Sequence, residues 1–186
     1  MDWVKRLANS DLRTRLARPI RETDGAEIAE TAIVLPLVFL FMLGIFWFGR
    51  AYNVYATVTY AAHEGAITAA RASCSDCGNA LQTPATVETR VKSVLQAAKL
   101  DPGQIATYSV TPAPAFCANL NPPGVCTPSG NVTVCRGVRL NAAGSTLPAC
   151  GALVSFKYPF QFYLPFTTLG MQLFNLPAAA EVPMEY

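Results

Sequence analysis

The feature that most constrains this chain is an uncharged apolar run of nineteen residues, Thr31–Gly49. As an α-helix at about 1.5 Å per residue the run is ~28 Å long, close to the hydrocarbon thickness of a bilayer. A helix of a globular protein normally keeps a polar face, and this run has none, so a buried core helix is a poor alternative. The run therefore predicts a membrane-spanning helix.

The charges around the run indicate its orientation. Only Arg50 closely follows the run, whereas six basic residues precede it: Lys5, Arg6, Arg13, Arg15, Arg18 and Arg21. Because positive flanks stay in the cytoplasm, we expect a cytoplasmic N-terminus and an exported C-terminal body. A cleaved secretory signal has a shorter apolar core and a small-residue cleavage site, which this run lacks. We interpret it as a retained anchor.

The composition excludes several function classes. A net charge of +2, without a cluster of Lys and Arg among aromatic residues, does not favour nucleic-acid binding. The only histidine, His63, has no nucleophile nearby in the sequence, and no glycine-rich phosphate loop is present. We therefore expect no enzyme activity, no cofactor and no metal site.

Helical periodicity continues past the apolar run. Between residues 51 and 71 apolar or small residues recur at helical spacing: Ala51, Val54, Tyr55, Val58, Ala61, Ala62, Gly65, Ala66 and Ala69. The sequence predicts a single helix from about Ala26 to Ala72 with an amphipathic outer half. Such a face needs a cover, and the rest of the chain is the obvious candidate.

The remaining residues predict an α+β domain with an antiparallel sheet. Thr83 and Pro84 are typical of a helix start, and this helix should end near Leu100. Its predicted buried face contains Val87, Val91, Val94, Leu95 and Ala98. Predicted strands are Ile105–Thr111, Asn131–Arg136, Ala152–Tyr163 and Ala179–Met184, with Pro159 at an edge or bulge and residues 112–130 in a loop.

All six cysteines follow the apolar run, as suits an oxidising compartment: Cys74, Cys77, Cys117, Cys126, Cys135 and Cys150. Zinc would need a second close pair besides Cys74-x-x-Cys77, and a thioredoxin-like motif should open a helix rather than follow one. Structural disulfides are therefore favoured. Locality suggests the pairs Cys74–Cys77, Cys117–Cys126 and Cys135–Cys150.

The residues just before the run form a specific arrangement. A basic leader ends at Gly25, Ala26 follows, and Glu30 lies at the cytoplasmic edge of the span. This arrangement resembles the processing site of type IV pilins and pseudopilins, which implies cleavage by a prepilin peptidase between Gly25 and Ala26. A carboxylate in lipid needs a partner, and in that family the free N-terminal amine of a neighbouring subunit is thought to supply it. The alternative is that Gly25 is a linker residue and that Glu27 and Glu30 face headgroups or water.

Four further segments resemble the TadE-like family, the pseudopilins of the tight-adherence (Tad, or Flp) pilus system. They are Glu-Ile-Ala-Glu-Thr-Ala-Ile-Val-Leu-Pro-Leu (27–37), Phe-Gly-Arg-Ala-Tyr (48–52), Ala-Ala-His-Glu-Gly-Ala (61–66) and Ala-Ala-Arg (69–71). His63 stands where the family usually has Arg. The resemblance covers about residues 25–71.

The resemblance implies a pilin-like fold in three parts: a leader at 1–25, a long helix at 26–72 with the span at 31–49, and an exported domain at 73–186. It also implies a single-pass protein of the bacterial inner membrane, possible incorporation into a pilus, and a role as a structural or accessory subunit in Tad pilus biogenesis for adhesion. The implied partners are a prepilin peptidase, other pilin or pseudopilin subunits, the Tad inner-membrane assembly machinery and membrane lipid.

Two alternatives stay open at this stage. Pro36 removes one helical hydrogen bond, and the resulting kink either helps subunits to pack or is merely tolerated. The chain as a whole could instead be a signal-anchored module that binds a ligand or surface and is never processed as a pilin.

Overall fold

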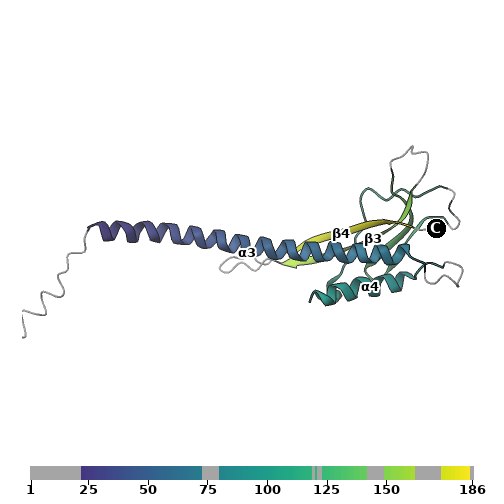
Figure 1. Cartoon of the computed structure of the whole chain (residues 1–186), viewed down its shortest axis with the longest axis horizontal. Coiled ribbons are helices and arrows are strands. Elements are labelled where there is room, and N and C mark those ends of the chain that lie inside the picture. Colours follow the sequence, from purple (N-terminus) through teal and green to yellow (C-terminus); the bar gives the residue numbers. More distant parts are fainter. Residues whose placement is uncertain are drawn as a thin grey trace, which may run out of the picture. The chain divides into compact units, whose positions relative to one another are not determined.

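The computed structural model describes residues 22–72, 80–118, 120, 123–141, 149–161 and 173–184. The chain divides into two compact units between Trp47 and Phe48. One helix, α3 (Glu22–Ala70), passes through this boundary (Figure 1). The prediction of a single helix from about Ala26 to Ala72 is therefore confirmed.

The second unit contains helix α4 (Pro84–Ala97), which begins as the sequence predicts. Thr83 is the N-cap, and its Oγ1 accepts a hydrogen bond of 3.3 Å from the Thr86 N–H. This contact satisfies one of the amide groups that a helix N-terminus leaves without a partner. Val87, Val91 and Leu95 are buried as the spacing predicts, whereas Val94 is half-buried and Ala98, the C-cap, is exposed.

Helix α4 ends at Ala97, earlier than the predicted Leu100, because Lys99 adopts a left-handed conformation with φ of 60°. The Leu100 N–H donates to the Leu95 carbonyl at 2.9 Å, and the Lys99 N–H donates to the Gln96 carbonyl at 2.9 Å. These two bonds make a Schellman motif, which usually has glycine where Lys99 stands.

The sheet has four antiparallel strands in the order β1-β2-β3-β4. Their bounds are Val125–Ser129, Val132–Arg139, Cys150–Gln161 and Leu173–Pro183, and a short 3₁₀ helix, η1 (Pro102–Gln104), follows α4. The α+β, pilin-like fold class is confirmed. Strand β1 lies in the region predicted as a loop, and β4 is longer than the predicted Ala179–Met184.

The predicted strand Ile105–Thr111 is wrong. This segment makes one bridge, in which the N–H groups and carbonyls of Ala106 and Lys157 exchange two hydrogen bonds of 2.9 Å. Strand β2 already pairs with β3 from Cys150 to Ser155, so the segment reaches only the free part of that edge. Pro159 lies two residues beyond the bridge on the same edge, where no described strand needs its missing N–H, which agrees with the edge prediction.

The core of the second unit combines α3, α4 and the sheet. Val58, Ala62 and Ala66 of α3 are buried together with Val91 of α4 and Phe156 of β3. In Figure 1, α4 lies beside the C-terminal half of α3. The predicted inward face of α3 is confirmed except at Tyr55, which is 47% exposed.

Four of the six cysteines form two disulfides, Cys117–Cys150 and Cys126–Cys135. The locality-based pairs Cys117–Cys126 and Cys135–Cys150 are therefore wrong. The reason is the β1–β2 hairpin, whose register places Cys126 directly opposite Cys135. Cys74 and Cys77 lie outside the described residues.

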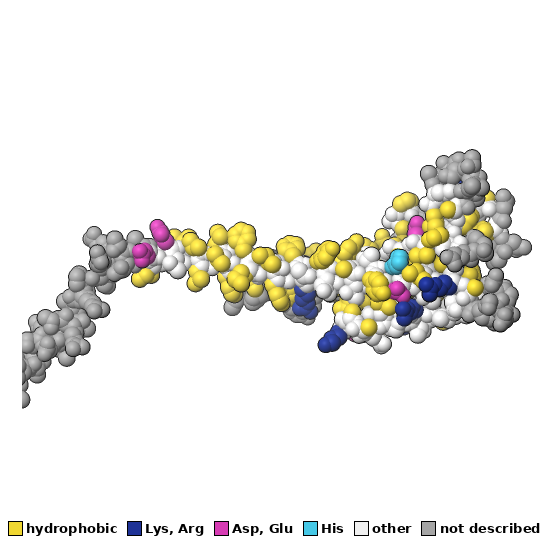
Figure 2. Space-filling model, in the orientation of Figure 1, with side chains coloured by type: hydrophobic (Ala, Val, Ile, Leu, Met, Phe, Trp, Pro, Cys, Tyr) yellow, Lys and Arg dark blue, Asp and Glu magenta, His cyan; other side chains and the backbone are white. Residues whose placement is uncertain are grey.

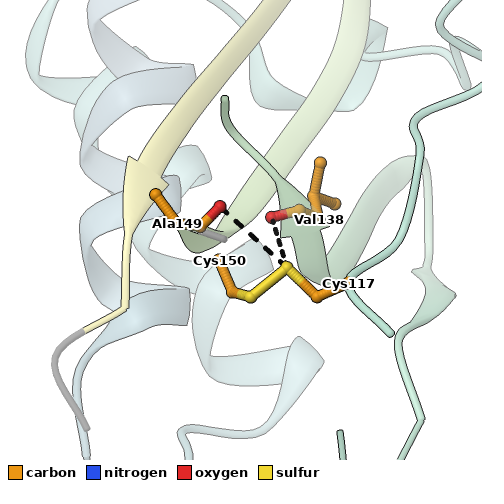
Figure 3. Close-up of a disulfide and its surroundings, with 4 residues drawn as sticks. All are labelled: Cys117, Val138, Ala149 and Cys150. Carbon is orange, nitrogen blue, oxygen red and sulfur yellow. Dashed lines mark hydrogen bonds between the residues drawn. A yellow bond between two sulfur atoms is a disulfide. The ribbon is translucent and has the colours of Figure 1, made fainter. Parts of the chain in front are cut away.

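The disulfide between Cys117 and Cys150 joins the segment before β1 to the first residue of β3 (Figure 3). The Cys117 N–H donates to the Gly137 carbonyl at 2.8 Å, which fixes its segment beside β2. Cys117 Sγ lies 4.0 Å from the Val138 carbonyl oxygen and 3.9 Å from that of Ala149. Because an oxidised sulfur has no hydrogen to donate, these are packing contacts.

Candidate functional site

The predicted processing site lies in the first turn of α3. Gly25 is exposed, and a Cβ built on it would meet no atom within 4 Å. The bond from Gly25 to Ala26 therefore belongs to the end of the helix rather than to its interior. The first four N–H groups of a helix have no intrahelical partner, so the chain can open at this end at little cost.

The two carboxylates that follow are both on the surface of α3. Glu27 and Glu30 are exposed, and acidic side chains appear at the N-terminal end of α3 in Figure 2. Thr31 Oγ1 donates a hydrogen bond of 2.8 Å to the Glu27 carbonyl one turn back. Glu27 and Glu30 are three residues apart on one helix, so each is the natural control for the other.

Most side chains of the apolar run are exposed in the part of the chain that the structure describes. Figure 2 shows hydrophobic side chains along this part of α3. Most of the large ones are exposed, whereas Leu43 is half-buried and Trp47 is buried. The exposed ones include Ile33 76%, Leu35 64%, Phe39 59%, Leu40 68%, Ile45 74% and Phe48 73%. Among the described residues, one helix, α3, is both long enough and apolar enough to cross a membrane. Only 6% of its most apolar stretch is buried. Such a helix fits a single membrane anchor or a signal sequence.

Pro36 lies inside α3 without ending it. Because proline has no N–H, the carbonyl of Ala32 lacks the donor that an uninterrupted helix would supply. The helix continues to Ala70, so the missing bond is a local weakness in the apolar run and not a break.

The Ala-Ala-His-Glu-Gly-Ala block packs α3 against the rest of the second unit. Ala61, Ala62 and Ala66 are fully buried, whereas His63 is exposed. A Cβ on Gly65 would lie 2.7 Å from Val91 Cγ2 and 3.3 Å from Val154 Cγ1. The small residues of the block therefore allow α3 to approach both α4 and β3 closely.

Glu64 in the same block forms an ion pair that the sequence did not reveal. Arg90 Nη2 on α4 donates to Glu64 Oε2 at 2.8 Å. The hydrogen bond from Arg90 is the main reason why the pKa of Glu64 is lowered from its ordinary value of 4.5. Twenty-six residues separate the partners, and no local spacing rule connects positions on two helices that far apart.

The described residues hold no group of three His, Cys, Asp or Glu side chains placed to bind a metal ion. Half-buried Arg136 has a structural role instead. Its Nη2 donates to the Gln82 carbonyl, and burial lowers the pKa of its guanidinium. These contacts tie β2 to the segment before α4 and are structural.

Comparison with known proteins gives one match. Residues 25–66 match the family described as TadE-like protein. The match begins at Gly25 and ends at Ala66. It therefore contains the predicted processing site, the apolar run and the Ala-Ala-His-Glu-Gly-Ala block at 61–66. No curated protein and no solved structure matches the chain.

Proposed function

Residues 25–66 are a TadE-like domain, and from this premise we propose that the chain is a pseudopilin of a Tad pilus system. In this role it is an accessory subunit that is inserted in the membrane, cut after Gly25 and used in pilus biogenesis for adhesion. The observation that carries the proposal is the family match itself, whose first residue is the glycine of the proposed cut. TadE-like proteins are associated with pili and are not known to be catalytic.

Three features of the molecule support this role. The apolar residues of α3 are exposed and need lipid or neighbouring subunits around them. The basic leader favours a cytoplasmic N-terminus. The two disulfides among the described residues favour an oxidising compartment outside the cytoplasm for the rest of the chain.

The first turn of α3 supports the proposed position of the cut. A prepilin peptidase would have to take residues around Gly25 in an extended form, which requires the first turn of α3 to open. Glycine is the residue that loses most conformational freedom in a helix, by roughly 1 kcal/mol relative to alanine, so it weakens that turn. Cleavage there would leave Ala26 as the new N-terminus and Glu30 as the fifth residue.

Glu30 is proposed to act in assembly and not in cleavage. Its carboxylate would pair with the N-terminal amine that cleavage creates on a neighbouring subunit, because a charge at the edge of lipid needs a counter-charge. The test compares Glu30→Ala with Glu27→Ala in a strain that makes Tad pili. We expect both variants to be cleaved, and only Glu30→Ala to lose piliation. Normal piliation in Glu30→Ala would remove this role.

The competing function is a signal-anchored binding module that is never processed as a pilin. It shares the exposed apolar helix, so the discriminating observation is processing itself. Co-expression with a prepilin peptidase should shorten the chain by its leader of 25 residues under the pseudopilin proposal. An unchanged size would favour the binding module.

A further inference from the structure

A polar pocket in the second unit is not accounted for by pilus assembly. It has a volume of about 340 Å³ and is lined by residues that include Arg50, Lys99, Gln104, Tyr158 and Gln161. Two cations and several hydrogen-bonding groups thus surround one hollow, formed by the start of the unit, the end of α4 and the end of β3. Such a set of side chains suits an anionic ligand with several oxygen atoms.

Lys99 is held in this pocket by an unusual backbone. Its φ of 60° places a lysine at the position of the Schellman motif where glycine avoids steric cost. A residue other than glycine is sterically strained in this conformation. No described residue accepts a hydrogen bond from Lys99 Nζ. Strained backbone conformations cluster at functional sites, and here the strain occurs at a cation that lines the pocket.

Asp101 has the one carboxylate among the lining residues, and this carboxylate binds the backbone of its own turn. Asp101 Oδ1 accepts a hydrogen bond of 2.9 Å from the Gly103 N–H. The Asp101 N–H in turn donates to Tyr158 Oη at 3.1 Å, which leaves the hydroxyl hydrogen of Tyr158 available as a donor. Burial raises the pKa of Tyr158, so this hydroxyl keeps its proton at neutral pH. Two cations, Arg50 and Lys99, therefore face one carboxylate in this pocket, and the Tyr158 hydroxyl adds a neutral hydrogen-bond donor.

The sequence places this pocket next to the apolar run. Arg50 is the first residue after Gly49, and the pocket also includes Gln161 and Leu173, the last residue of β3 and the first of β4. Residues 162–172, which join these strands, contain no charged side chain. Leu173 and Phe174 are 65% and 47% exposed. Exposed apolar residues beside basic ones are typical of a surface at the level of lipid headgroups.

We propose that this pocket binds the phosphate of an anionic phospholipid in the leaflet that faces the exported domain. Arg50 and Lys99 supply charge, and Gln104, Gln161 and the Tyr158 hydroxyl supply hydrogen bonds to phosphate and glycerol oxygens. The proposal depends on the membrane span of the proposed function. Its role would be to hold the outer end of the span at a fixed depth before assembly.

The test uses the full chain purified in a mild nonionic detergent. It is titrated with phosphatidylglycerol or with phosphatidylcholine of the same acyl chains, and bound lipid is counted by native mass spectrometry. We expect phosphatidylglycerol to bind about tenfold more tightly, a difference of ~1.4 kcal/mol. Lys99→Gly removes the ammonium and relieves the strained backbone, so it should fold well and abolish most of this preference. Arg50→Gln should reduce it as well.

Arg71→Gln is the matched control, because Arg71 is an exposed cation at the end of α3 that does not line the pocket. It should leave the preference unchanged. Equal binding of the two lipids, or an unchanged preference in Lys99→Gly, would overturn the proposal. Inorganic phosphate binding as tightly as phosphatidylglycerol would assign the site to free phosphate instead. A chain that stays soluble without detergent would contradict the membrane span, and the lipid site with it.

Discussion

Gly65 of α3 and Val91 of α4 approach each other so closely that a Cβ on Gly65 would lie 2.7 Å from Val91 Cγ2. Val91 is fully buried and β-branched, so its side chain has little freedom to move away. The glycine of the 61–66 block is therefore a packing residue. It sets the distance between the long helix and the domain that covers it.

Gly65→Ala should destabilise the second unit by about 1–2 kcal/mol, since overpacking costs ~1–3 kcal/mol and alanine returns up to about 1 kcal/mol of helix propensity. The measurement is denaturant unfolding of the full chain in detergent. Gly49→Ala is the control, because nothing lies within 4 Å of a Cβ there. The double variant Gly65→Ala with Val91→Ala should lose less stability than the two single variants lose together. Additive effects would contradict the close contact.

The second prediction concerns the disulfides. Cys117–Cys150 closes a loop of 33 residues and Cys126–Cys135 one of 9. The entropy of loop closure makes them worth about 4 and 3 kcal/mol respectively, so Cys117→Ala with Cys150→Ala should cost roughly 1 kcal/mol more than Cys126→Ala with Cys135→Ala. Unfolding of both double variants checks the order. Peptide mapping without reduction checks the pairing, and a fragment linking Cys117 to Cys126 would refute it.

A third prediction concerns the left-handed end of α4. Lys99→Gly and Lys99→Ala both remove the ammonium, but only glycine adopts a φ of 60° without steric cost. Glycine should therefore be more stable than alanine by about 1 kcal/mol. Thermal unfolding of the two variants measures this difference. Equal stability would mean that the Schellman motif does not form.

A fourth prediction concerns pH. Glu88 accepts hydrogen bonds from Lys92 Nζ at 2.6 Å and from Ser129 Oγ at 2.8 Å, and these lower its pKa from the ordinary value of 4.5, with Lys92 contributing most. A lowered pKa stabilises the folded state above pH 4.5, and this stabilisation is lost as the pH falls through the folded-state pKa.

The stability difference between the natural chain and Glu88→Gln should therefore be up to about 1 kcal/mol at neutral pH and shrink as the pH falls below 4.5. Unfolding curves at several pH values measure it. Ser129→Ala should raise the pKa of Glu88 toward its ordinary value, which NMR titration of the carboxyl group detects. A difference that grows on acidification would have the wrong sign and would rule out this linkage.

The sequence predicted the helices well because their signals are local. The apolar run, the inward face of α3 and the Thr83-Pro84 start of α4 each follow from spacing or capping within one segment. The end of α4 could not be predicted in this way, because no spacing or capping rule predicts a left-handed backbone conformation at Lys99. The small side chains of the 61–66 block were visible in the sequence, but their contact with Val91 was not.

The sheet was predicted less well because its pairing is not local. Strand β1 contains Pro128 and lies in a segment rich in proline, cysteine and glycine. Because this composition is typical of loops, the segment was predicted as a loop. One available signal was missed: Gly130-Asn131 joins β1 and β2 as a two-residue turn, with a φ of 53° at Gly130. Recognising that hairpin would have placed Cys126 opposite Cys135. Strand β4 was predicted too short because it contains Pro177, which lies opposite Lys157.

The most direct measurement of the central claim is the N-terminal residue of the mature chain. The chain is expressed with its prepilin peptidase, extracted from membranes and analysed by intact mass and N-terminal sequencing, with a catalytically inactive peptidase as the control. The account predicts a chain that begins at Ala26 with the active peptidase and retains residues 1–25 with the inactive one. A mature chain that begins elsewhere, or one that keeps its leader in both cases, would contradict it.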